Sequence, residues 1–162
     1  MPGHLETFYL YHIIFNAIFL LCEYGSLLFI IKKEKKLKEI KFPFLEHTGA
    51  TLKSFEKGSA EVELHTKPHH LQHLGFIHGG VISTLMDNTG WYAAMSNLDE
   101  GYTAVTMEIK INYLKPATGK YLIAKAEVKR QGRTTAFVTI ELLCEEKLVA
   151  YATGTYAILE EK

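Results

Sequence analysis

The sequence contains little cysteine and no excess charge of either sign, and both absences narrow the class of protein. Only two of its 162 residues are cysteines, Cys22 and Cys144, and they lie far apart without the spacing of metal ligands. Neither a disulfide framework nor a zinc knuckle is indicated, so we expect a reduced, cytoplasmic setting. Lysine plus arginine equals aspartate plus glutamate at 18 each, so no overall field favours nucleic acid.

Repeats and low-complexity tracts are also missing. The length is sufficient for one domain with a substantial core and is short for two. We divide the chain into an apolar N-terminal segment with a basic linker at 1–41 and a folded domain at 42–162. Pro43 at the domain entry is expected to break any helix there, because proline removes a backbone donor.

The N-terminal segment is apolar from 7 to 31 and is followed at once by lysines at 32, 33, 35 and 36. Its length would span a bilayer, and the lysines would hold its C-terminal side in the cytoplasm. Glu23 inside the run makes a span costly, and no basic residue precedes the run as in a secretory signal. Three interpretations stay open: a membrane anchor, a helix docked on the domain, and an assigned start upstream of the natural one.

Short alternating runs predict two strands, then one helix, then four strands. Turn lengths between the later strands indicate antiparallel neighbours. The fold class is therefore α+β, with about six strands curled around one long helix. Residues expected on one face of the first strand after the helix are Val105, Met107, Ile109, Ile111 and Tyr113, with Thr106, Glu108, Lys110 and Asn112 on the other.

The helix, expected over 80–98, begins at a glycine pair and carries one carboxylate, Asp87. Backbone N–H groups of Gly79 and Gly80 would lie at the positive end of the helix dipole, where an oxyanion is stabilised. Gly79 and Asp87 are eight residues apart, so about 12 Å separates them along one helix at about 1.5 Å per residue. They cannot touch the same carbonyl carbon. If they serve one reaction, Asp87 comes from a second copy related by a two-fold axis, which predicts a homodimer with shared sites.

The order of elements, with LGFIHGGVISTLMD and the later INYLKPA run, resembles the hotdog-fold acyl-CoA thioesterases of the PaaI type, within the 4-hydroxybenzoyl-CoA thioesterase superfamily. The resemblance covers about 42–159 and leaves out the apolar N-terminus. It rests on an acidic residue nine positions after the histidine of HGG and an amide seven before its first glycine. It implies hydrolysis of acyl-CoA thioesters without cofactor or metal, by a homodimer that pairs into a dimer of dimers.

The resemblance also implies roles for individual residues. The Gly79 N–H would bind the thioester carbonyl, Asp87 would act as nucleophile or general base, Gln72 would hold the carbonyl or a water, and Thr106 would lie near the attacking water. The residues it places on the substrate side are His78, Gly80, Lys129, Arg130 and Arg133, the last three as partners of the coenzyme A phosphates.

Plainer interpretations stand beside these. Asp87 is also consistent with a structural carboxylate, His78 with a histidine bonded to backbone, and the basic residues with a solvated turn. The histidines at 65, 69, 70, 73 and 78 match no zinc pattern. The alternative function is a non-catalytic acyl-CoA binding or sensing module on the same fold. A hotdog dehydratase is disfavoured because its histidine-containing motif is not found.

Overall fold

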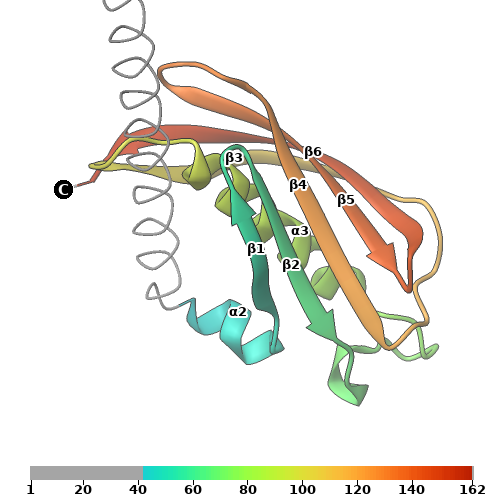
Figure 1. Ribbon diagram of the computed structural model, residues 1–162. Helices are drawn as coiled ribbons and strands as arrows, with labels where there is room; N and C mark the ends of the chain where they lie inside the picture. The colour runs from blue at the N-terminus through green and yellow to red at the C-terminus, as the bar shows by residue number, and fades with distance from the viewer. Residues whose placement is uncertain (1–41, 162) are drawn as a thin grey trace, which may run out of the picture. The chain divides into compact units, whose positions relative to one another are not determined.

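The computed structural model describes residues 42–161, and these form one antiparallel sheet wrapped around a long helix (Figure 1). The strands are β1 (Thr51–Glu56), β2 (Ser59–His65), β3 (Tyr102–Tyr113), β4 (Tyr121–Gln131), β5 (Thr135–Cys144) and β6 (Lys147–Glu160). Their order in the sheet is β1-β2-β4-β5-β6-β3, so β1 and β3 form its edges. The helices are α2 (Pro43–Thr48), the short η1 (Pro68–His70) and the central α3 (Gly79–Ser96). This is the predicted hotdog fold. The expected apolar helix at 7–31 lies outside the described residues, and the domain boundary at 41/42 stays a prediction.

The first element corrects the expectation for Pro43. Proline does not prevent a helix here but begins one, because Pro43 occupies the first turn of α2, where its missing N–H has no intrahelical partner in any case. The helix ends at Gly49, whose φ of +77° is the left-handed conformation favoured by glycine. The buried side chain of α2 is Leu45.

The core lies between α3 and the concave face of the sheet. Alternate residues of β2, β4 and β5 point to the helix, as the sequence pattern predicted, and most of them are fully buried. They are Ala60, Val62, Leu64, Leu122, Ala124, Ala126, Ala136, Val138, Ile140 and Leu142. From α3, Ile82, Leu85, Met86 and Ala93 pack against them. Removing apolar surface from water contributes about 25 cal/mol of stabilising free energy per Å², so this packed layer holds the helix against the sheet.

The edge strand β3 departs from the predicted alternation. A β-bulge shifts the register between Thr106, which lies opposite Tyr156, and Glu108, which lies opposite Thr155. Residues opposite one another share a face of the sheet. Thr106 therefore lies on the helix side before the bulge, and Ile109 and Ile111 lie there after it. The prediction that Val105 and Ile109 share a face was wrong, because a bulge inserts one residue and inverts the pattern beyond it.

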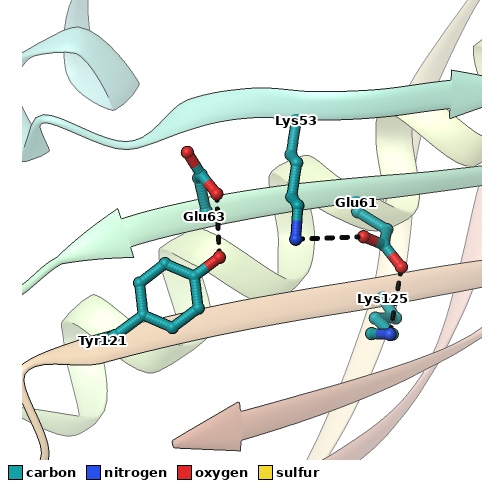
Figure 2. Close-up of polar contacts among 5 residues, drawn as sticks. All are labelled: Lys53, Glu61, Glu63, Tyr121 and Lys125. Atoms are coloured by element: carbon teal, nitrogen blue, oxygen red, sulfur yellow. Dashed lines mark hydrogen bonds and ion pairs between the residues drawn. The ribbon is translucent and has the colours of Figure 1, made fainter. Parts of the chain in front are cut away.

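The convex face of the sheet is polar over β1, β2 and β4. Figure 2 shows Glu61 between Lys53 at 3.8 Å and Lys125 at 3.1 Å, and Tyr121 donating a 2.8 Å hydrogen bond to Glu63. These exposed pairs contribute little stability but keep this face charged. No helix within residues 42–161 is long and apolar enough to cross a membrane.

Candidate active site

The N-terminus of α3 is capped by the histidine that precedes the glycine pair. His78 is the N-cap residue, and its Nδ1 accepts a 2.8 Å hydrogen bond from the Gly80 N–H. Nδ1 is therefore unprotonated in this arrangement. The bond corrects the expectation that both glycine amides are free, because Gly80 donates to His78. No hydrogen bond from the Gly79 N–H is found within the described chain. One donor at the positive helix end is thus available to a ligand.

A groove of about 340 Å³ opens beside this donor. Its walls are mainly apolar and come from the loop before α3, from α3 itself and from the segment after β3: Gln72, Phe76, Ile77, Gly79, Ile82, Tyr113, Leu114, Lys115, Pro116 and Ala117. The Gln72 Oε1 accepts a 2.9 Å bond from the Leu74 N–H, which fixes the amide and leaves its NH₂ as a donor. The Tyr113 hydroxyl donates a 3.3 Å bond to the Gly79 carbonyl. Gln72 and Gly79, predicted to act together, therefore do line one groove.

Asp87 lies two turns further along α3, on the face turned to β3. Its Oδ1 accepts a 2.8 Å hydrogen bond from the Thr106 hydroxyl. Partial burial raises the pKa of the Asp87 carboxyl above its usual 3.8, and the bond from Thr106 opposes part of that rise. No ion pair to Asp87 is found among the described residues. A half-buried carboxylate without a cation beside it is unusual and is characteristic of functional sites.

A buried tyrosine of β6 contacts the backbone of Asp87. The Tyr156 side chain is 0 % exposed, and its hydroxyl donates a 3.1 Å bond to the Asp87 backbone carbonyl. Burial, and then the charge of Asp87, raise the pKa of Tyr156 far above its usual range, so this hydroxyl keeps its proton. Gly90 of α3 leaves room for this side chain, because a Cβ atom there would lie 2.0 Å from the Tyr156 hydroxyl oxygen of β6.

The basic residues at the end of β4 (Lys129 and Arg130) and in the turn after it (Arg133) lie away from these groups in the described chain. Gln131, the last residue of β4, donates a hydrogen bond to the Asn97 carbonyl just after the end of α3. The turn is therefore beside the end of the helix opposite to Gly79. Lys129 pairs with Glu127, while Arg130 and Arg133 are exposed. Within one chain they join neither Gly79 nor Asp87, and their role toward coenzyme A stays a prediction.

The histidine-rich loop is organised by the hydrogen bonds of the buried His70. His70 is 1 % exposed; its Nδ1 accepts from the Lys67 N–H at 2.9 Å, and its Nε2 bonds the Thr48 carbonyl at 2.8 Å. Its own carbonyl accepts from the His78 N–H at 2.9 Å, which links this loop to the start of α3. Within the part of the chain that the structure describes, no three His, Cys, Asp or Glu side chains converge on a point.

Two functional candidates were not found by sequence reasoning. Tyr113 stood inside the INYLKPA run, but nothing in that run indicated that its ring would lie over Gly79. Tyr156 ends a plain strand pattern, and only the glycines at 90 and 154, each close to its ring, signal its position.

Comparison with known proteins identifies the family of this chain. The model of the thioesterase superfamily matches residues 74–151. A candidate esterase of Saccharolobus solfataricus is 36% identical over 79% of this chain and 89% of its own. Human acyl-coenzyme A thioesterase 13 is 32% identical over 65% of this chain and 76% of its own. The Escherichia coli PaaI protein of the phenylacetic acid degradation operon superposes with a TM-score of 0.74, at 25% identity, over 82% of this chain and 95% of that one.

A curled antiparallel sheet around a helix that presents a glycine amide and a carboxylate defines the hotdog class of thioester hydrolases. The chain belongs to the thioesterase superfamily, in its PaaI-type branch.

Proposed function

We propose that this protein hydrolyses acyl-CoA thioesters to the free acid and coenzyme A, at sites shared between two copies of the chain. The observation that carries this proposal is the Gly79 amide in an apolar groove, combined with an Asp87 carboxylate on the same helix that has no ion pair among residues 42–161. The human relative bears the name of an acyl-coenzyme A thioesterase, which supports coenzyme A as the thiol. A binding or sensing module would not require a desolvated carboxylate beside the acyl site.

The chemistry follows from the two groups. The Gly79 N–H, with the Gln72 amide, binds the carbonyl oxygen and stabilises the negative charge that grows on it. Asp87 either removes a proton from a water that attacks the carbonyl carbon or attacks that carbon itself and is then released by water. In both routes the carbon–sulfur bond breaks and the thiolate receives a proton. The first route is favoured by the Thr106 hydroxyl, which lies beside Asp87 where a water could be oriented.

A shared site requires a dimer, and the exposed edge of β3 is the surface we propose for it. Long free edges invite pairing, and β3 exposes large apolar side chains, with Met107 64% and Val105 46% exposed. Thr106 contacts Asp87 near the middle of β3, and Tyr113 contacts Gly79 at the C-terminal end of the strand. Two antiparallel copies of β3 would therefore set the Thr106–Asp87 pair of one chain beside the Tyr113–Gly79 pair of the other.

The direct experiment measures release of free thiol from a panel of aryl, short-chain and medium-chain acyl-CoAs by the purified protein. We expect turnover with at least one of them and its loss in the variant Asp87→Asn. Saturable binding of an acyl-CoA without thiol release would favour the sensing module instead. A monomer that retains full activity would contradict the shared site. The further pairing into a dimer of dimers and the cytoplasmic setting stay predictions.

A further inference from the structure

The Tyr156 side chain fits between α3 and β6 because the two positions closest to it are glycines. A Cβ atom on Gly90 would lie 2.0 Å from the Tyr156 hydroxyl oxygen, and a Cβ atom on Gly154 would lie 2.8 Å from its ring. Real Cβ atoms do not approach other atoms so closely, so a glycine on α3 and a glycine on β6 are both needed to admit this ring. The hydroxyl then reaches the Asp87 carbonyl in the middle of α3.

Tyr156 is also tied to the partner of the Asp87 carboxylate. In the β3–β6 ladder Tyr156 lies directly opposite Thr106, just before the bulge. Opposed residues of an antiparallel pair share a face, with Cβ atoms about 4.5–5.5 Å apart. One tyrosine thus borders both members of the Asp87–Thr106 pair: the first through its backbone carbonyl and the second through the strand register.

We propose that Tyr156 is a positioning residue for the reaction: its buried hydroxyl fixes the middle of α3 against β6 so that the Asp87 carboxylate meets the Thr106 hydroxyl. It touches no substrate and acts through Asp87. The role rests on the proposed function, since it assigns Tyr156 a part in that reaction. The neutral, fully buried hydroxyl suits the task, because it has no solvent partner to compete with the helix carbonyl.

The chain offers an unusually clean probe of this arrangement. Its only aspartates are Asp87 and Asp99, so protein labelled with ¹³C at the aspartate side-chain carboxyl gives two resonances, and Asp87→Asn assigns them. Asp99, which is exposed, serves as an internal reference. The titration midpoint of Asp87 then reports its bond from Thr106 without any turnover.

The test compares Tyr156→Phe, Thr106→Val, the double variant and Tyr92→Phe in the full chain. Tyr92, which lies on α3, is the matched control, because it is buried like Tyr156 but packs on Phe42 and Trp91 instead of bonding Asp87. Since the Thr106 bond lowers the pKa of Asp87, loosening it raises the midpoint. We expect Tyr156→Phe and Thr106→Val each to raise the midpoint, the double variant to add nothing further, and Tyr92→Phe to leave it unchanged.

Turnover gives the second readout. We expect Tyr156→Phe to lower kcat about tenfold with KM within about twofold of the parent, as the loss of one buried hydrogen bond allows. An unchanged midpoint and kcat would overturn the proposal, and so would lost stability with an unmoved midpoint, because that result describes a purely structural tyrosine. A parent without thioesterase activity but with a midpoint that moves as expected would refute the proposed function and leave the coupling of Tyr156 to Asp87 standing.

Discussion

Thr106 and Asp87 are 19 residues apart in sequence, yet the Thr106 hydroxyl donates a 2.8 Å hydrogen bond to the Asp87 carboxylate. The bond crosses from the edge strand β3 to the central helix, and it is made just before the bulge that inverts β3. Bulges commonly re-aim a side chain beside an active site. Here the register before the bulge keeps Thr106 on the helix side, while Ile109 and Ile111 take over that side after it.

The pH dependence of hydrolysis follows from this pair. Burial raises the pKa of Asp87, and the reaction needs the ionised carboxylate, so kcat/KM falls as pH drops through that raised value. Thr106→Val removes the opposing hydrogen bond and moves the acid limb to higher pH. Thr106→Ser, which keeps the hydroxyl, is the control and should retain the parental limb. A limb that stays in place in the valine variant would mean that another group controls it.

Replacement of Asp87 separates function from stability. Asp87→Asn should lower kcat by about 10²–10⁴-fold, the usual share of a general base. The same variant should melt a few degrees higher at neutral pH. A raised pKa means that the folded state binds more protons than the unfolded one above pH 3.8, so ionisation of Asp87 weakens the fold as pH rises. Scanning calorimetry at neutral and acid pH checks this. A melting gain that is as large at acid pH would contradict it.

Gly79 can be tested through its backbone. It is the first residue of α3, where proline is well tolerated, and His78 already has the extended φ of −63° and ψ of 137° that a residue before proline prefers. Gly79→Pro removes the free N–H and should lower kcat about 10²–10³-fold.

Gly79→Ala is the control for that variant, because it keeps the N–H and the atom nearest to its Cβ would be a Tyr113 ring carbon at 3.6 Å, an ordinary van der Waals distance. It should retain most of the activity. Circular dichroism should find both variants folded. Equal loss in the two variants would indicate that bulk, not the missing donor, is responsible.

His70 should make the fold sensitive to acid. Its pKa is lowered by burial first and then by the charge of His69, while its bond to Thr48 acts in the opposite direction. Below pH 6.5, His70 is therefore protonated more readily in the unfolded chain than in the folded one. The free energy of unfolding decreases as pH falls from that value. His70→Gln should lose about 1–3 kcal/mol of stability and flatten this dependence. His73→Gln, at an exposed position, should change neither in urea unfolding at several pH values.

The sequence was sufficient for the strand pattern because one face of β2, β4 and β5 is buried throughout, which makes a period of two unmistakable. It also predicted the helix start at Gly79 and singled out Asp87, and the family resemblance added Gln72; the catalytic roles of these three residues stay predictions. It failed where geometry overrides local preference. The β3 bulge leaves no trace in composition, and Pro43 begins a helix because the first turn has no donor to lose. The sequence also did not show that the Gly80 N–H bonds the His78 side chain. The bond from the Tyr156 hydroxyl to the Asp87 carbonyl joins residues 69 positions apart, so no local pattern predicts it.

The most direct test of a site shared between chains mixes two inactive variants. Asp87→Asn and Gly79→Pro, co-expressed with different tags, form mixed dimers in which one site has both the Gly79 amide and the Asp87 carboxylate intact. Random assortment predicts recovery of about a quarter of the parental activity, concentrated in the doubly tagged fraction. If each chain carried its own complete site, every site in the mixture would hold one defect. The doubly tagged dimers would then be as inactive as either parent variant, and this result would contradict a site shared between chains.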